Sequence, residues 1–287
     1  MKPTCLHVWL KKIFNNISVL WFSEKIIIRM IHPYTNIHSE AKIGEGVQIE
    51  AFVTIEKDVE IGDGCWIGPN VSVMEGARIG KNVKIHPGAV ISNVPQDLKF
   101  QGEKTYTYIG DNTVVRECVT INRGTADRWK TEIGADCLLM AYVHIAHDCH
   151  IGDGCIIANS CQIAGHVTIQ DFARLGGTTA VHQFVKIGSH CMIGGGSLVR
   201  KDVPPFITAA REPLIYSGVN SVGLQRSGFS PEKINQIQEV YRHYFLKGNN
   251  KAQALKLIEE EIPDSQEKDQ ILDFIKNSER GVIKGYH

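Results

Sequence analysis

Large aliphatic residues recur at every sixth position through most of the chain. From Ile37 to Val199 this register has 28 positions, of which 25 are Ile, Val or Leu. An amphipathic helix would instead place apolar residues three and four apart. A period of six is typical of a parallel β-helix, in which each hexapeptide forms one side of a triangular coil. The pattern therefore predicts a mostly β fold.

A second inward position lies four residues after each aliphatic residue and is small. It holds, among others, Ala41, Val47, Val53, Cys65, Val71, Ala77, Cys149, Cys155 and Cys161. Glycine often follows the aliphatic residue, and glycine, Asn and Asp suit tight turns at the corners. Three units make a coil of 18 residues, so the 168 residues from 37 to 204 predict about nine coils stacked about 4.8 Å apart.

Two polar segments, 92–108 and 122–132, interrupt the register. Both preserve the coil phase, because position 109 follows 91 by 18 residues and position 133 follows 121 by 12. We predict that they are loops extruded from an edge of the prism. Loops on rigid scaffolds often carry function.

Both ends of the chain lie outside the repeat. Residues 1–29 are mildly basic and lack a small-residue cleavage site, so we do not expect a signal peptide. We expect a natural start at Met30, the alternative being a disordered or docking N-terminus. The predicted β-helix covers 30–205 and ends at consecutive prolines, which stop the repeat.

Residues 206–287 are predicted to form a linker and a C-terminal helical domain. Ser230 followed by Pro231 predicts the start of a helix, because these residues favour the N-cap and the first helical position, and Gly248 would close it. Further helices are predicted over 252–261 and 266–277 from their helical apolar spacing.

Charge and cysteine usage exclude several functional classes. Lys and Arg total 31, as do Asp and Glu, which argues against a nucleic-acid binder with a broad basic surface. No apolar run approaches the roughly 20 residues of a membrane-spanning helix. Six of the eight cysteines fall on the small inward position and no C-x-x-C is present. Cysteines of this kind behave as small buried hydrophobic residues, so we expect reduced thiols in a cytoplasmic protein.

Histidines gather in one part of the repeat, and the coil length predicts which of them share a patch. Adding 18 leads from His147 to Gly165 and then to Gln183, and from Asp148 to His166. A general base beside a backbone N–H that no side chain covers is the pairing that acyl transfer requires. We therefore predict a catalytic patch here.

The residues alone leave two other hypotheses open. His144, His147 and His150 lie in one coil, and three histidines can hold zinc with one open position, as in a zinc lyase of the γ-carbonic-anhydrase type. The second alternative is a non-catalytic hexapeptide scaffold with exposed histidines on one face.

More specific motifs accompany the repeat. They are residues 95–100 (PQDLKF), 116–121 (RECVTI), 138–149 (LLMAYVHIAHDC), 164–167 (AGHV), 179–184 (TAVHQF), 202–205 (DVPP) and 218–220 (GVN). In these motifs, residues 30–287 resemble the acyl-[acyl-carrier-protein]–UDP-N-acetylglucosamine O-acyltransferases, which carry out the first step of lipid A synthesis.

The resemblance implies a left-handed coil and a cytoplasmic homotrimer with active sites between neighbouring chains. It implies acyl carrier protein and UDP-N-acetylglucosamine as partners, without metal or cofactor. His147 would be the general base, Asp148 its partner, and the Gly165 amide the group that stabilises the oxyanion. The implied substrate-binding residues are Asp97, Lys99, His144, His166, His182 and Gln183, with Gly195 gating acyl length and Asn220 and Arg226 at the nucleotide.

The nucleotide-binding residues depart from the family pattern. Ser227 follows Arg226 where the family often carries a second arginine, and Val222 stands where an acidic residue is common. The resemblance also implies that Gly195 leaves room for a long acyl chain. It leaves two acceptors open, UDP-N-acetylglucosamine and its 3-amino analogue.

Overall fold

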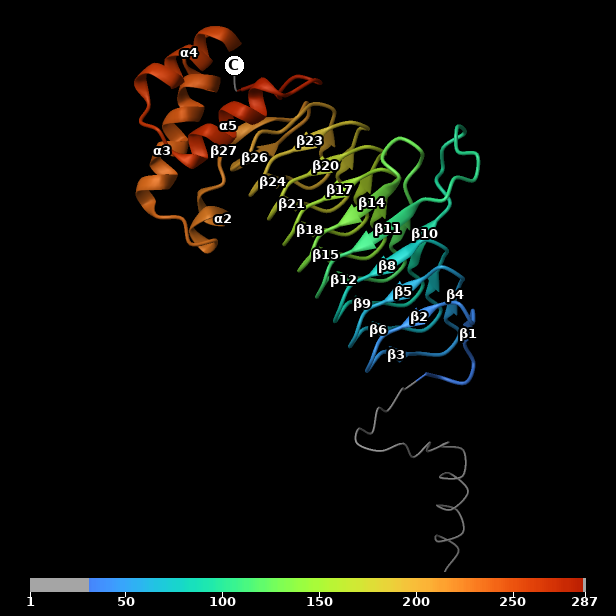
Figure 1. The fold of residues 1–287 in the computed structure, drawn as a ribbon. Coiled ribbons are helices and arrows are strands. Elements are labelled where there is room, and N and C mark those ends of the chain that lie inside the picture. Colours follow the sequence, from blue (N-terminus) through green and yellow to red (C-terminus); the bar gives the residue numbers. More distant parts are fainter. Residues whose placement is uncertain (1–30, 286–287) are drawn as a thin grey trace, which may run out of the picture.

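The six-residue register folds as a stack of short parallel strands in the computed structural model, which describes residues 31–285. Each strand pairs with the strand one coil further along, so that Ile145 lies beside Ile163 and Ile163 beside Val181. Three sheets of parallel strands form the walls of a triangular prism (Figure 1), and among the described residues only the last strand of one sheet, residues 215–219, pairs antiparallel with its neighbour. The expectation for residues 1–29 lies outside the described residues.

The three walls contain nine, eight and ten strands. The first sheet comprises β1 (Asn36–Ile37), β4 (Thr54–Ile55), β7 (Ser72–Val73), β10 (Val90–Asn93), β13 (Thr120–Asn122), β16 (His144–Ile145), β19 (Gln162–Ile163), β22 (Ala180–Val181) and β25 (Leu198–Val199). The second comprises β2 (Lys42–Ile43), β5 (Glu60–Ile61), β8 (Ala77–Ile79), β11 (Tyr106–Ile109), β14 (Lys130–Ile133), β17 (His150–Ile151), β20 (Thr168–Ile169) and β23 (Lys186–Ile187). The third comprises β3 (Gln48–Ile49), β6 (Trp66–Ile67), β9 (Lys84–Ile85), β12 (Val114–Val115), β15 (Leu138–Leu139), β18 (Ile156–Ile157), β21 (Arg174–Leu175), β24 (Met192–Ile193), β26 (Ile207–Ala210) and β27 (Ile215–Val219).

The prism interior is filled by the two inward positions of each repeat. From Val47 onward, the aliphatic and small positions of the repeat are almost all buried. The six cysteines predicted to face inward are buried as well. Their thiols find backbone acceptors, as where Cys149 Sγ donates to Ala164 O at 3.1 Å. Burying these apolar side chains away from water drives the stacking of the coils.

At one edge of the prism, between the first and second sheets, bulky residues occupy left-handed turn positions. Asp148, His166 and Phe184 have φ values of 58°, 63° and 65° and lie one coil apart. Such conformations are uncommon for residues other than glycine. The same turn conformation recurs at the other two edges, as at Phe52 and Phe172, so it belongs to the repeat. This column is a candidate site because it places a carboxylate and an imidazole one coil apart.

Both predicted loops leave the prism at this same edge. They connect β10 to β11 and β13 to β14, and they rise side by side in Figure 1, where Arg123 N donates to Asn93 O at 3.0 Å. The loops end earlier than predicted, before residues 108 and 132. Residues 106–109 and 130–133 are strands, because Thr107 pairs with Thr131 and extends the second sheet.

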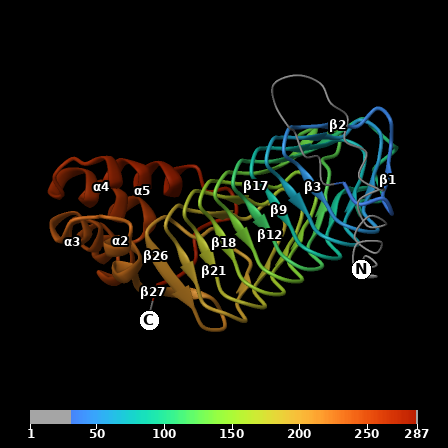
Figure 2. The same cartoon turned by 90° about the horizontal axis from the view of Figure 1, so that it is seen from below.

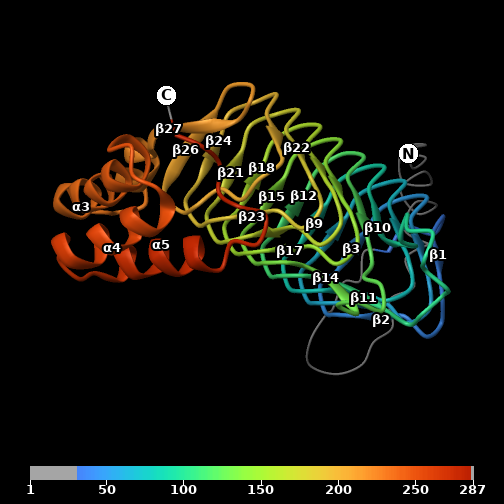
Figure 3. The same cartoon turned by 90° about the horizontal axis from the view of Figure 1, so that it is seen from above.

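The C-terminal region packs helices against the end of the prism (Figures 2 and 3). The helices are α2 (Ser221–Arg226), α3 (Pro231–Tyr241), the π-helix η1 (Arg242–Leu246), α4 (Lys251–Glu261) and α5 (Gln266–Lys276). Ser230 caps α3 as predicted. Tyr241 ties α3 to the prism, because its buried hydroxyl donates to Pro205 O at 2.6 Å. Within residues 31–285, no helix combines the length and the apolar character that crossing a membrane would require.

Candidate active site

His147 lies at the prism edge, in the turn between β16 and β17. Its Nδ1 is 2.8 Å from Asp148 Oδ2, and its side chain is 13% exposed. The ring therefore faces outward from the prism but is largely covered. This is the environment in which a histidine keeps a fixed orientation and still reaches a substrate.

Asp148 is fully buried beneath the imidazole and accepts four hydrogen bonds. Oδ2 accepts from His147 Nδ1 and from Thr125 Oγ1 at 2.6 Å. Oδ1 accepts from the backbone N–H groups of Thr125 at 3.0 Å and Arg128 at 3.2 Å. Burial acts to raise the pKa of Asp148, but the bonds from His147, Thr125 and Arg128 outweigh it and lower the pKa to about 2. The group is thus a carboxylate that holds a proton on His147 Nδ1 and leaves the Nε2 lone pair free.

Gly165 lies one coil further along, directly against the His147 ring. A β-carbon on Gly165 would come within 2.7 Å of Cε1 and 2.9 Å of Nε2. Only glycine leaves this space, because other residues carry a β-carbon there.

The backbone N–H of Gly165 donates to no group within residues 31–285. At another edge of the prism, carboxylates accept from the first residue of the turn, as where Ala135 N donates to Asp153 Oδ1 at 2.7 Å and Asp153 N donates to Asp171 Oδ1 at 2.9 Å. Gly165 has no such acceptor and lies beside an imidazole. Its N–H is therefore available to a substrate oxygen.

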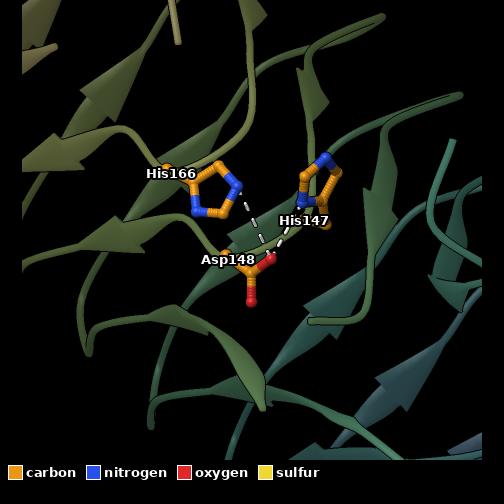
Figure 4. A group of neighbouring side chains, drawn as sticks. All are labelled: His147, Asp148 and His166. Carbon is orange, nitrogen blue, oxygen red and sulfur yellow. Dashed lines mark hydrogen bonds and ion pairs between the residues drawn. The ribbon is translucent and has the colours of Figure 1, made fainter. Parts of the chain in front are cut away.

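His166 places a second imidazole across Asp148, as Figure 4 shows. Its ring centroid is 5.0 Å from that of His147, at 88°, and its Nε2 is 4.0 Å from Asp148 Oδ2. On the other side, Asp127 Oδ2 lies 3.1 Å from His166 Nδ1. The ring also stacks on Phe184 at 4.5 Å. The buried carboxylate thus lies between two ordered imidazoles.

His144 and the residues after β22 extend this patch. His144 Nδ1 is 2.7 Å from Thr120 Oγ1. Burial, and then the nearby His147, holds the pKa of His144 below its usual value, so it is a neutral hydrogen-bonding group at pH 7. His182 and Gln183 are exposed, and His182 Nδ1 lies 3.1 Å from Gln183 O.

Five predicted substrate-binding residues lie elsewhere in the chain and form no hydrogen bond or ion pair with His147. Asp97 and Lys99 are in the loop after β10, where Lys99 N donates to Asp97 Oδ1 at 3.0 Å. Gly195 is at a different edge, where its β-carbon would come within 3.2 Å of Gly177 O.

Asn220 and Arg226 lie at the two ends of α2. Asn220 caps the helix by accepting from Gly223 N at 3.2 Å, and its Nδ2 donates to His190 O at 2.9 Å. Arg226 is exposed. One chain therefore assembles the acid–base patch but leaves the predicted nucleotide contacts away from it.

The zinc hypothesis does not fit the three histidines on which it depended. His144 and His150 belong to different sheets, and His150 is exposed beside Glu132, with Nδ1 at 3.4 Å from Oε2. The set with metal-like spacing is His147, Asp148 and His166, whose ligand atoms lie within 4.8 Å of one another. Both oxygens of Asp148 already accept two hydrogen bonds each, so this arrangement suits proton transfer better than metal ligation.

A hollow of about 500 Å³ lies on the second sheet, away from this patch. Its lining includes Glu60, Arg78, Glu132 and His150, and these groups pair with neighbouring charges. Its imidazole is exposed and is not held by a buried carboxylate, and the His147 patch is therefore the better candidate.

Sequence patterns missed the groups that hold the patch together, namely Thr125, Asp127 and Arg128. All three lie in the loop after β13, where the six-residue register is interrupted. The only signal in the sequence was the polar character of segment 122–132, after which the six-residue register resumes in phase.

Sequence comparison matches residues 202–283 to the family described as Udp N-acetylglucosamine O-acyltransferase, Domain 2. Residues 58–93 and 130–165 match the bacterial transferase hexapeptide family (six repeats). Curated relatives named acyl-[acyl-carrier-protein]--UDP-N-acetylglucosamine O-acyltransferase include one from Sulfurihydrogenibium sp. (strain YO3AOP1), 49% identical over 88% of this chain and 93% of the relative. Another, from Chlorobaculum tepidum, is 48% identical over 86% of this chain and 94% of the relative.

Solved structures show the same architecture. The UDP-N-acetylglucosamine acyltransferase from Bacteroides fragilis 9343 superposes with a TM-score of 0.87 at 50% identity, covering 89% of this chain and 100% of that one. The enzyme from Campylobacter jejuni gives 0.84 at 35% identity, covering 90% and 100%. These likenesses confirm the predicted left-handed parallel β-helix with a C-terminal helical region.

Proposed function

This chain belongs to the acyl-[acyl-carrier-protein]–UDP-N-acetylglucosamine O-acyltransferase family and is an acyltransferase, and from that premise we propose its reaction. It transfers an (R)-3-hydroxyacyl chain from acyl carrier protein to the glucosamine 3-hydroxyl of UDP-N-acetylglucosamine, in the cytoplasm. His147 is the general base.

The observation that carries this proposal is the orientation of one imidazole. His147 Nδ1 is held by Asp148 at 2.8 Å, and the Nε2 side of the ring lies against Gly165. A base that is oriented by a carboxylate and adjoins an uncovered N–H satisfies the two geometric requirements of acyl transfer.

The chemical steps follow from that geometry. Nε2 of His147 takes the proton of the sugar hydroxyl, and the oxygen attacks the thioester carbonyl carbon. The carbonyl oxygen becomes an oxyanion, which accepts a hydrogen bond from the Gly165 N–H. The tetrahedral intermediate expels the pantetheine thiolate, which takes the proton from the His147 imidazolium. Asp148 remains ionised and stabilises that imidazolium.

Substrate binding needs groups beyond this patch. We assign His144, His166, His182 and Gln183 to the acyl and sugar portions beside His147. Asp97 and Lys99 reach the sugar or the pantetheine arm from their loop, and Gly195 limits the length of the acyl chain. Asn220 and Arg226 bind the nucleotide, and the guanidinium of Arg226 is suited to the pyrophosphate.

A homotrimer accounts for the separation of these groups within one chain. Active sites between neighbouring prisms would combine the His147 patch of one subunit with the α2 residues of another. Symmetric association of this kind is common among soluble proteins.

The decisive experiment is an acyl-transfer assay with carrier-protein thioesters of graded chain length and with both acceptors, UDP-N-acetylglucosamine and its 3-amino analogue. We expect transfer of a long hydroxyacyl chain, and a loss of several orders of magnitude in His147→Ala with the fold retained. Unchanged turnover in His147→Ala would refute the assignment of the base.

A further inference from the structure

Thr125, in the loop between β13 and β14, makes the shortest of the four hydrogen bonds to Asp148. We propose that Thr125 is a positioning residue, which fixes the carboxylate and thereby the tautomer and the basicity of His147. The inference rests on the proposed function, because it assigns the residue a part in that acid–base pair.

Thr125 holds both oxygens of the carboxylate at once. Its hydroxyl donates to Asp148 Oδ2 at 2.6 Å, and its backbone N–H donates to Oδ1 at 3.0 Å. Two bonds from one residue to both oxygens fix the plane of the carboxylate. Thr125 is itself 8% exposed, so water does not readily replace either bond.

The direction of the Thr125 hydroxyl is set by a third bond. Asp127 N donates to Thr125 Oγ1 at 3.3 Å, which occupies a lone pair of that oxygen. The hydroxyl hydrogen is then left to point at Asp148 Oδ2. Because this is the oxygen that accepts from His147 Nδ1, threonine and histidine share one acceptor.

Sharing that acceptor has two consequences for His147. The fixed carboxylate keeps the proton on Nδ1, so that Nε2 faces the substrate as an acceptor. The same fixed carboxylate stabilises the imidazolium that forms when Nε2 takes the proton of the sugar hydroxyl. The other titratable groups that face the pair are His144, His166, Asp127 and Arg128.

Thr125→Val tests the proposal, because it keeps the shape of the side chain and removes the hydroxyl. We expect kcat to fall about 10- to 100-fold, the range typical when a group that orients a reactive side chain is removed, with KM changed less than about twofold. The acidic limb of the pH–rate profile should move to lower pH, since a carboxylate that is free to turn away from Nδ1 stabilises the imidazolium less. Thr125→Ser, which keeps the hydroxyl, should restore both.

A substrate-free readout separates this inference from the proposed function. The ¹⁵N NMR shifts of His147 report which ring nitrogen carries the proton, and we expect one tautomer in the native protein and in Thr125→Ser but a mixture in Thr125→Val. Thr107→Val is the matched control. Thr107 is fully buried on β11 and its hydroxyl has no hydrogen-bond partner, so neither the tautomer nor the rate should change.

Two results would overturn the role of Thr125. One is an unchanged tautomer and pH profile in Thr125→Val, and the other is an equal loss in Thr125→Ser. If His147→Ala kept full activity, the proposed function would fail, whereas the NMR comparison would still decide whether Thr125 orients the pair.

Discussion

Gly165 matters for the β-carbon that it lacks, because the imidazole of His147 occupies that space. A methyl group there would meet the ring at 2.7 to 2.9 Å, closer than van der Waals contact allows, while the backbone on either side would be unchanged. The ring would have to move, and misplacement of a reacting group by about 1 Å can cost about 100-fold in rate.

Gly165→Ala is therefore expected to lower kcat by about 100-fold and to leave the fold intact. The rate is measured by acyl transfer, and folding by circular dichroism and thermal unfolding on the same preparation. A variant with native rates would show that the ring can shift without cost and that its contact with Gly165 is incidental.

The buried carboxylate of Asp148 also predicts a pH dependence of stability. Its pKa is about 2 in the folded protein and about 3.9 in an unfolded chain. Because the folded value is the lower one, Asp148 contributes stability above about pH 4, and this contribution disappears as the pH falls toward 2. The linkage amounts to about 2–3 kcal/mol at neutral pH.

Asp148→Asn removes that titration while keeping the shape of the side chain. Urea unfolding of both proteins from pH 6 to pH 2.5 measures the effect. The native protein should be the more stable at pH 6, and the difference should shrink as the pH falls. A difference that stays constant over this range would mean that the carboxylate is not stabilised as its hydrogen bonds imply.

The contact between His147 and Gly165 was predictable from the sequence, because a regular coil of 18 residues fixes which side chains are neighbours. The contacts of Thr125 and Asp127 were not. Both residues lie in a loop outside the register, and whether a loop folds back over the edge depends on hydrogen bonds such as Arg123 N to Asn93 O. Such bonds have no period in the sequence.

Among the helices, those with strong local signals were predictable and those with weak ones were not. Ser230 and Pro231 mark the start of α3 at the predicted place. The helix α2 has six residues, only Leu224 of which is buried, so it has no apolar periodicity to detect. It is held by its cap, since Asn220 bonds both to Gly223 N and to His190 O.

A buried lysine joins the last two helices. Lys268, on α5, is 3% exposed, and its Nζ donates to Ile262 O at 2.7 Å and to Glu259 O at 3.4 Å. These carbonyls lie at the end of α4, where no helical N–H remains to satisfy them. Asp264 adds an ion pair at 3.0 Å.

Lys268→Met should destabilise the helical region by about 1–3 kcal/mol, because it keeps the apolar stem and leaves buried carbonyls without a donor. Lys256→Met is the control. Lys256 is 73% exposed and pairs with Glu260 only at 3.7 Å, so the expected change is below about 0.5 kcal/mol. Chemical unfolding followed by circular dichroism distinguishes them, and equal effects would mean that the buried ammonium does not stabilise the end of α4.

At the scale of the whole molecule, the acid–base patch and α2 lie in different parts of the fold. His147 is at an edge in the middle of the prism, whereas Arg226 is on a helix after the last coil. The proposed general base and the proposed nucleotide-binding arginine are therefore separated along the axis of a rigid stack. A site shared between two chains would bring His147 and Arg226 together. The 18-residue repeat predicts which residues are neighbours within one chain, but it does not predict contacts between chains.

Mixing two inactive variants tests this arrangement. His147→Ala and Arg226→Ala should each have little activity, but a site built from the His147 of one chain and the Arg226 of the next would be intact in some mixed trimers. With equal amounts and random assembly, about one site in four is native, so co-expression should restore up to about a quarter of the native rate. Each variant expressed alone and combined only after purification is the control, because stable trimers would not exchange. Co-expression without any recovery, in trimers shown by mass spectrometry to be mixed, would place both residues in a site formed by a single chain.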